Sequence, residues 1–283
     1  MLSLDLYLPF IMVFGGYLLA GGKLGIILKS LPFEMMMIGG AAVGSFALSN
    51  SLDVCKSTAK DLKRVFKGSR WSRDNYLDVL RVLHHLLNIA KKHPVELEQH
   101  LDNPLESKIF ERFPKLLSDH GAVDMICDTL RAVSMNFDNP MEIEDLLEIK
   151  VEEQRHHQEH SSHSLQTVAD ALPALGIVAA VLGVIKTMAS IDQPPEVLGK
   201  LIGGALVGTF LGVFLAYCVV APFAAKIKAV SDEDVYFYKV IKDTLVAYVR
   251  GHPTKMCLEV ARQGIPVAHR PSFDDLELAI KES

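Results

Sequence analysis

Four long apolar stretches limit what this chain can fold into. The hydrocarbon core of a bilayer is roughly 30 Å thick and needs about 20 apolar residues in a helix, since each unpaired backbone amide in lipid costs several kcal/mol. Residues 6–28, 34–52, 171–189 and 201–225 meet this requirement, although Gly21, Gly22 and Lys23 interrupt the first stretch. The sequence therefore predicts an all-α membrane protein with four transmembrane helices and a large cytoplasmic helical domain.

The composition supports this segregation. Hydrophobic residues make up 49% of the chain although charged residues still make up 22%, so the two kinds must lie in separate blocks. The formal net charge of −5 gives no basic excess, which argues against nucleic acid as a partner and leaves the lipid bilayer as the expected environment. The first apolar run has no basic leader and no small-residue cleavage site, so we expect a retained helix.

Charge placement predicts the topology. The linkers at residues 30–32 and 190–200 are short and carry little positive charge, whereas basic residues follow the second and fourth stretches. By the positive-inside rule, both termini are expected in the cytoplasm. The expected domains are transmembrane helices 1 and 2 (1–52), a cytoplasmic helical domain (53–170), transmembrane helices 3 and 4 (171–225) and a cytoplasmic C-terminal helical segment (226–283).

The cytoplasmic part has helical periodicity. Leu80, Leu83 and Leu87 form one apolar stripe that follows Ser72, a candidate N-cap. From Met141 onward, an amphipathic pattern continues without a helix breaker until Pro173. We expect this helix to run directly into the third span.

The middle of each predicted span lacks a carboxylate. Asp5, Glu34 and Asp170 lie at the edges, where we expect headgroups or water to solvate them. An ion pathway usually needs a titratable or charged oxygen ligand inside the membrane. If this chain conducts ions, the carboxylate is expected from a partner subunit. Lys186, near the end of the third span, is expected to extend to the interface.

Small residues recur along the third and fourth spans and predict close helix packing. The third span could pack on the fourth within one chain, and the small faces could also contact partner helices or neighbouring copies; we favour the second reading. The residues of this helix-packing set are Gly176, Gly183, Gly204, Gly208, Gly212 and Ala216.

Two prolines, Pro173 and Pro222, stand at the cytoplasmic ends of the third and fourth spans. Inside a helix, proline removes a donor and clashes with the preceding turn at about 3 kcal/mol. A kink without further role and a hinge are both compatible with this spacing.

Several histidines, His156, His157, His160 and His163, have metal-ligand spacing below the third span. A metal site also needs a closed ligand set and groups that orient the ligands, so we interpret this stretch as a solvated helix face and predict no metal. No nucleophile arrangement, phosphate loop or zinc-protease motif predicts an enzyme. The four cysteines have no CxxC pair, which argues against a disulfide framework or a zinc site.

Two motifs resemble a known family. LPALGIVAAVLG at 172–183 and VGTFLG at 207–212, with Tyr217 and Pro222 after them, are similar to the third and fourth spans of MotA proteins, subunits of the flagellar motor stator. GHP at 251–253 and RPSF at 270–273 match the family's C-terminal pattern.

The resemblance implies a homopentamer around two helices of a MotB-like subunit, whose membrane aspartate binds the ion. It implies that Pro173 and Pro222 couple ion passage to movement and that Glu98 faces the rotor protein FliG. The family's basic rotor-facing residue falls at Ala90 here, so Lys91 is our first choice for that role and Lys92 our second.

The resemblance also implies that Ala180, Thr209 and Tyr217 line the ion path. Sodium-driven relatives tend to have threonine at the position of Ala180, and alanine offers no oxygen to sodium. We therefore expect a transported proton rather than sodium, and no cofactor. The alternatives are a sodium-driven stator of the PomA type and an energy-transducing channel subunit like ExbB or TolQ, which usually has three spans.

Overall fold

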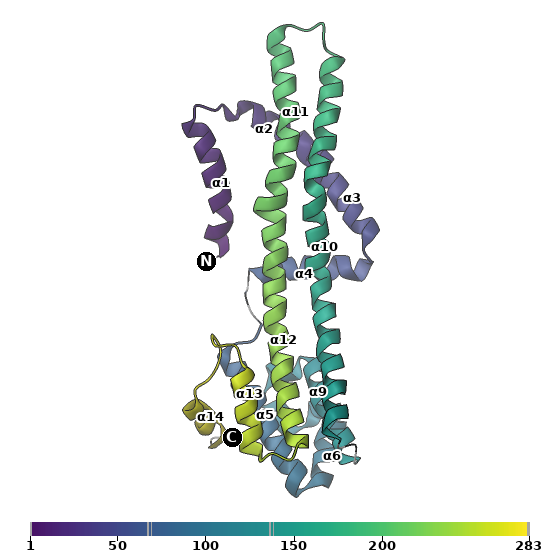
Figure 1. Cartoon of the computed structure of the whole chain (residues 1–283), viewed down its shortest axis with the longest axis vertical. Helices are drawn as coiled ribbons and strands as arrows, with labels where there is room; N and C mark the ends of the chain where they lie inside the picture. Colours follow the sequence, from purple (N-terminus) through teal and green to yellow (C-terminus); the bar gives the residue numbers. More distant parts are fainter. Residues whose placement is uncertain (1, 67, 69, 136, 138, 282–283) are drawn as a thin grey trace. The chain divides into compact units, whose positions relative to one another are not determined.

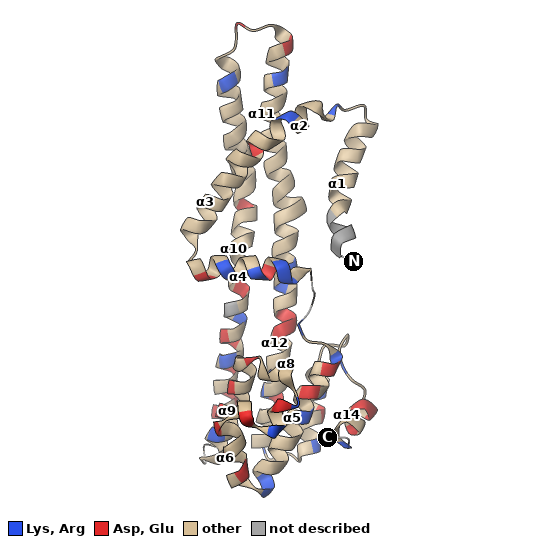
Figure 2. Ribbon diagram, turned by 180° about the vertical axis from the view of Figure 1, so that it is seen from behind, with Lys and Arg blue, Asp and Glu red and all other residues tan. Residues whose placement is uncertain are grey.

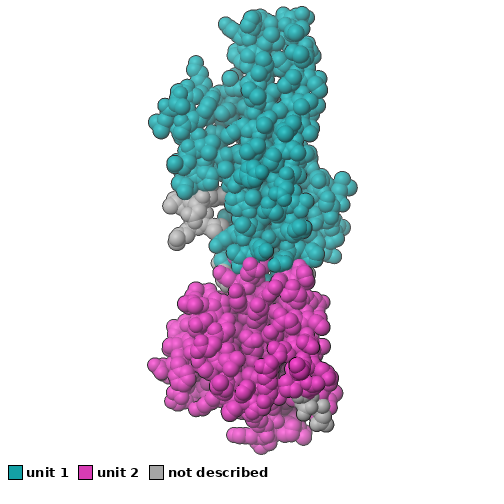
Figure 3. Space-filling model, in the orientation of Figure 1, with its two compact units in different colours: residues 1–68, 158–229 teal, residues 69–157, 230–283 magenta. Residues whose placement is uncertain are grey.

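The computed structural model describes residues 2–66, 68, 70–135, 137 and 139–281. Every regular element among these residues is helical, which confirms the all-α prediction. The chain forms two compact units (Figure 3): unit 1 contains residues 1–68 and 158–229, and unit 2 contains residues 69–157 and 230–283. The four expected domain boundaries stay a prediction.

Unit 1 holds the apolar helices (Figure 1). Two long helices are shared with unit 2: unit 1 contains the second part of α10 (Pro140–Met188) and the first part of α12 (Ala221–Val249). Its other elements are α1 (Leu2–Leu19), α2 (Leu24–Glu34), the π-helical segment η1 (Met35–Gly39), α3 (Gly40–Ser49), α4 (Leu52–Val65), α11 (Pro195–Leu215) and the π-helical segment η3 (Ala216–Val220).

The first turn of the chain lies earlier than the sequence predicted. Helix α1 ends at Leu19, the chain turns at Gly21, whose φ is +83°, and α2 begins at Leu24. A positive φ costs glycine little, whereas other residues adopt it only with strain. The expected span 6–28 and turn at 30–32 are therefore wrong. The chain turns at Gly21 instead, and residues Leu24–Ser49 form one continuous helical run after that turn.

Pro32 lies inside that run rather than in a turn. The π-helical segment η1 follows three residues later. Figure 1 shows that the run changes direction between α2 and α3.

Three helical runs are long and apolar enough to cross a membrane: Leu24–Ser49, Pro140–Met188 and Pro195–Val249. The apolar helix Tyr7–Leu19 is shorter. In Figure 2, the hairpin of α10 and α11 is nearly free of charged residues over most of its apolar length, with charges toward its tip. Three of the four expected spans thus have a counterpart of sufficient length, and a membrane crossing by the shorter α1 stays a prediction.

Unit 2 is a packed helical domain around one apolar core. Trp71 stacks on Phe237 with ring centroids 3.7 Å apart, and Leu80, Leu83 and Leu87 are fully buried as the stripe predicted. With the remaining parts of α10 and α12, its elements are α5 (Arg73–Lys92), α6 (Pro94–Asp102), the 3-10 helix η2 (Pro104–Glu106), α7 (Lys108–Glu111), α8 (Pro114–Leu117), α9 (His120–Ser134), α13 (Thr254–Gly264) and α14 (Phe273–Lys281).

Two local predictions about helix ends are confirmed. Ser72 caps α5 and forms a reciprocal capping box with Asn75. The amphipathic helix expected from Met141 is part of α10, which continues without a break from Pro140 to Met188. Its continuity places Pro173 inside a helix and not at a helix end.

Candidate functional site

Glycines bring the backbones of α10 and α11 into contact. A Cβ atom on Gly176 would lie 2.9 Å from the carbonyl oxygen of Gly208, and one on Gly212 would lie 2.7 Å from that of Leu172. A Cβ atom on Gly183 would lie 2.7 Å from the Cβ of Ala205. Distances under about 3 Å exclude a side chain, so these glycines are needed for packing within one chain.

The second face of the α11 stripe packs against α2. A Cβ atom on Gly204 would lie 2.9 Å from Ser30 Oγ, and one on Gly208 would lie 2.6 Å from Glu34 Oε2. Ala216 is fully buried in a small apolar cluster that includes Ile38. Contacts within the chain thus account for all six residues of the helix-packing set, and contacts with partner helices stay a prediction.

Glu34 does not lie where the sequence predicted. It was expected at a membrane edge in water, yet only 5% of it is exposed. The expectation is wrong because α2 begins at Leu24, which moves Glu34 into the interior of the Leu24–Ser49 run. The signal that could have located it is the Gly21-Gly22 pair, which marks the turn before it.

A cavity of about 480 Å³ adjoins Glu34 between α2, α10 and α11. Lys186 is exposed, as expected of a side chain that reaches the interface, and lines this cavity. The other polar side chains in its lining are Lys29, Ser30, Glu34 and Lys200. Charged groups therefore gather at a place where the sequence predicted a short turn with little positive charge.

Ala180 and Thr209, two of the expected ion-path residues, lie at one level of the hairpin. A Cβ atom on Gly208, the neighbour of Thr209, would be 3.3 Å from the backbone nitrogen of Ala180. Both side chains are half-buried. Tyr217 lies eight residues beyond Thr209, about 12 Å along a helix, and is 66% exposed. The structure thus groups the first two and leaves Tyr217 apart.

The two expected coupling prolines differ in their surroundings. Pro173 is half-buried inside α10. Pro222 is exposed at the second residue of α12, directly after the π-helical segment η3. A π turn before a proline offers room for the ring where a regular helix would clash with it. Their coupling role stays a prediction.

The expected rotor-facing residues lie on both sides of the turn between α5 and α6. Glu98 is exposed on α6, and Lys91 and Lys92 are in the last turn of α5. Lys91 Nζ donates a hydrogen bond to the carbonyl oxygen of His252 at 3.3 Å and lies 5.5 Å from the centroid of the Tyr248 ring. Lys91 is therefore held against the end of α12.

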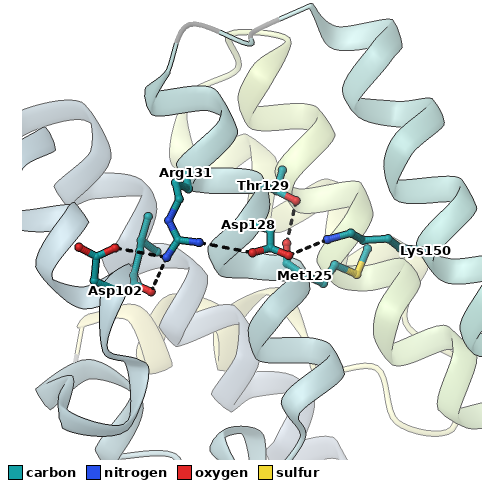
Figure 4. A network of polar contacts seen from close by, with 7 residues as sticks. Asp102, Met125, Asp128, Thr129, Arg131 and Lys150 are labelled. Atoms are coloured by element: carbon teal, nitrogen blue, oxygen red, sulfur yellow. Dashed lines mark hydrogen bonds and ion pairs between the residues drawn. The ribbon is translucent and has the colours of Figure 1, made fainter.

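A polar network holds the helix that carries Glu98 (Figure 4). Arg131 Nη2 on α9 donates to the carbonyl oxygen of Leu101 at 3.0 Å and to Asp102 at 3.3 Å. Asp128, which also pairs with Arg131, accepts from Lys150 of α10 at 3.0 Å. Apart from the Asp128–Arg131 pair within α9, these partners lie too far apart in sequence for spacing to predict them.

Asp119 is a second polar centre that the sequence did not predict. It caps α9 by accepting from the amide of Ala122 at 3.0 Å, and it accepts from the Tyr238 hydroxyl at 2.6 Å. Its other oxygen pairs with Arg70 at 2.6 Å. Burial and this hydrogen bond raise the pKa of Tyr238 above its usual range, so the phenol stays a donor.

The histidine stretch shows no closed arrangement among its described side chains. His156 and His160 are exposed on α10, and His156 Nε2 lies 3.5 Å from Glu152 Oε1 on the same helix. The side chain of His157 lies outside the described residues. Within the described part of the chain, no group of three or more His, Cys, Asp or Glu residues could hold a metal ion. The described cysteines are all free thiols.

Two family models match the chain: the N-terminal model of motility protein A at residues 6–94, and the MotA/TolQ/ExbB proton channel family at residues 119–239. Motility protein A of Salmonella typhimurium is 38% identical over 94% of this chain and 90% of that relative. The chemotaxis protein LafT of Vibrio parahaemolyticus is 35% identical over 95% of this chain and 94% of its own.

Two solved structures have a similar fold. One, the structure of C. jejuni MotAB, matches with a TM-score of 0.72 and 22% identity over 96% of this chain and 98% of that chain. The other, the flagellar MotAB stator complex from Bacillus subtilis, matches with a TM-score of 0.66 and 18% identity over 98% of each chain. Given the matched family models and the near full-length identity above 30%, this chain belongs to the motility protein A family, a family of proton channel subunits and not of enzymes.

Proposed function

We propose that this chain is a stator subunit of the bacterial flagellar motor that, with a MotB-like partner, forms an ion channel and converts proton flow into torque on the rotor. The observation that carries the proposal is its match to motility protein A along nearly the whole length. Its likeness in fold to the B. subtilis protein, which belongs to a flagellar stator complex, supports it.

The proposed location is the bacterial inner membrane, crossed four times with both termini in the cytoplasm. Basic residues after Ser49 and after Pro222 support this orientation. In this arrangement α1 is the first span although it is short, and the linker between α10 and α11 faces the periplasm.

The proposed assembly is a ring of five copies around two helices of the partner. Apolar side chains on the outer faces of α10 and α11 support it: Ile177, Val181, Ile185 and Leu206 are each more than half exposed. In a membrane protein, such faces are covered either by lipid or by other helices.

In the proposed mechanism, protonation of the partner's aspartate lets its helix move against the face of α10 and α11. Each proton that crosses 100 mV supplies about 2.3 kcal/mol, which is enough to bias a small rotation step. Pro173 and Pro222 would act as pivots. Glu98, with Lys91 or Lys92, would pass the motion to FliG through charge pairing across the interface.

The choice of proton over sodium rests on Ala180. Its methyl group cannot replace a hydration oxygen of sodium, and half-buried Thr209 is the nearest hydroxyl on α11 at this level. A sodium-driven stator is the second candidate. A transducing role like that of ExbB or TolQ is the third. Those proteins usually have three spans and an outside N-terminus, so the proposed topology of four spans with both termini inside disfavours it.

The experiment is a torque measurement in a flagellated cell without stators, supplied with this chain and its MotB-like partner. We expect torque that survives removal of sodium and is lost when the proton gradient is collapsed. Dependence on sodium would keep the motor function and refute the choice of ion. A complex that assembles in the membrane but gives no torque in either medium would refute the stator function.

A further inference from the structure

Glu34 is a buried acid in the apolar unit that the proposed mechanism does not use. The side chain is 95% buried, since only 5% of it is exposed, and its Oε2 has no hydrogen-bond partner among the described residues. A carboxylate buried without a partner is costly, and ionisable residues inside membrane helices are typically found where ions or protons pass. A residue with a purely structural role would be expected to have a partner for this oxygen.

The helix opposite Glu34 is shaped to admit the carboxylate. Glu34 Oε2 lies 2.6 Å from where a Cβ atom on Gly208 would lie, so glycine at position 208 leaves the carboxylate its present place, and a larger residue there would require it to shift. The same Cβ position is 3.3 Å from the backbone nitrogen of Ala180. Glu34 therefore reaches the level of the hairpin at which Ala180 and Thr209 are the expected ion-path residues.

The adjoining cavity extends from this carboxylate to residues near the ends of α10 and α11 that flank the linker between them. Lys186 precedes this linker and Lys200 follows it, and both line the cavity together with Lys29 and Ser30. A volume of about 480 Å³ has room for several water molecules at about 30 Å³ each, and polar groups are present to bind them. Water can therefore carry a proton from the linker side to Glu34.

The charges that face this cavity favour a proton over a metal cation. Three ammonium groups, from Lys29, Lys186 and Lys200, share the cavity with one carboxylate, so a bound sodium ion would meet net repulsion. A proton needs no vacant coordination shell, because it arrives by exchange along hydrogen-bonded water.

We propose that Glu34 is a proton-exchanging group of this chain itself, which takes a proton from water in the cavity between α2, α10 and α11 and passes it toward the partner's aspartate. An O–H bond forms on the Glu34 carboxylate as a hydronium or water donor loses its proton, and the same bond breaks when the proton leaves on the far side. This inference rests on the proposed stator function.

The test uses the full chain with its MotB-like partner in cells without other stators. Motor speed at low load and proton flux are measured across a range of external pH, from mildly acidic to mildly basic, for the parent, Glu34→Gln, Glu34→Asp and the matched control Glu196→Gln. Glu196 is an exposed acid in the first turn of α11, close to the same linker. Partner co-purification is measured for each variant.

We expect Glu34→Gln to assemble with its partner and to lower proton flux about tenfold or more, since a positioned proton-transfer group commonly contributes factors of that size or larger. Its speed should lose most of its dependence on external pH. Glu34→Asp should retain a substantial part of the flux, and Glu196→Gln should match the parent. Parental flux and pH dependence in Glu34→Gln would overturn the proposal.

A second measurement keeps the proposal testable if Glu34→Gln does not assemble. Ser30→Cys, in a background that carries Cys218→Ala, places a thiol in the cavity lining without changing Glu34. A membrane-impermeant methanethiosulfonate added outside the cell should label this thiol and lower the motor speed. A thiol that stays unlabelled would overturn the aqueous route. Every variant is compared with the parent. A parent that gives no torque would therefore refute the stator function, whereas a difference confined to the variants tests the role of Glu34.

Discussion

At the residue scale, Asp119 stabilises unit 2 by satisfying three donors from different parts of the chain. Tyr238→Phe removes one donor, so we expect a loss of about 1–2 kcal/mol in unfolding free energy. Asp119→Ala should cost about 3 kcal/mol, at the low end for a broken buried pair, because water can still reach Arg70. Thermal unfolding of the purified protein measures both.

The matched control is Tyr236→Phe, because Tyr236 is exposed. We expect its melting temperature to stay close to the parent's, whereas Tyr238→Phe should melt several degrees lower, at about 2–4 °C per kcal/mol for domains of this size. Equal melting temperatures for the two variants would mean that the hydrogen bond to Asp119 contributes nothing measurable.

Also at the residue scale, the contacts of Lys91 separate the two candidates for the basic rotor-facing residue. Lys91 is held by the carbonyl oxygen of His252 and the ring of Tyr248. Exposed charge pairs contribute about 0–1 kcal/mol, so we expect Lys91→Ala to reduce torque only partly. Lys91→Arg should restore it, and Lys92→Ala should be close to the parent. A larger loss with Lys92→Ala would reassign the role to Lys92.

At the scale of elements, glycine determines how closely α10 and α11 approach. Gly212→Ala would place a Cβ atom 2.7 Å from the carbonyl oxygen of Leu172, so the helices must separate, at about 1–3 kcal/mol for an overpacked contact. Gly199→Ala, on the same helix, is the matched control because its Cβ would have no neighbour within 4 Å. We expect reduced yield of the assembled complex only for Gly212→Ala; equal yields would show that the helices can adjust.

At the scale of the whole molecule, Pro173 is the test of the proposed coupling between ion passage and movement. It lies inside α10, a single helix of 49 residues. Pro173→Ala restores a backbone donor and removes a clash, so α10 should form at least as well as before. We expect normal assembly with the partner and little torque, measured with a bead on the flagellar stub. Parental torque would remove the hinge role.

The sequence by itself determined the class of the protein. Apolar runs of sufficient length, small residues at four-residue spacing and basic flanks are local features, and together they predict packed helices that cross a bilayer. The same holds for the Leu80, Leu83 and Leu87 stripe and for the Ser72 cap, because both depend on neighbours within one helix. The family motifs added the expected partners and the candidate residues.

Only the tertiary structure decided where Glu34 lies, which glycines touch a backbone and what holds Lys91. A glycine turn at Gly21, rather than the expected turn at Pro32, shifted the helix and moved Glu34 from a wet edge to a buried contact with α11. Such contacts join residues that lie tens to more than a hundred positions apart. Local propensity does not encode them, because they depend on how closely whole helices approach one another.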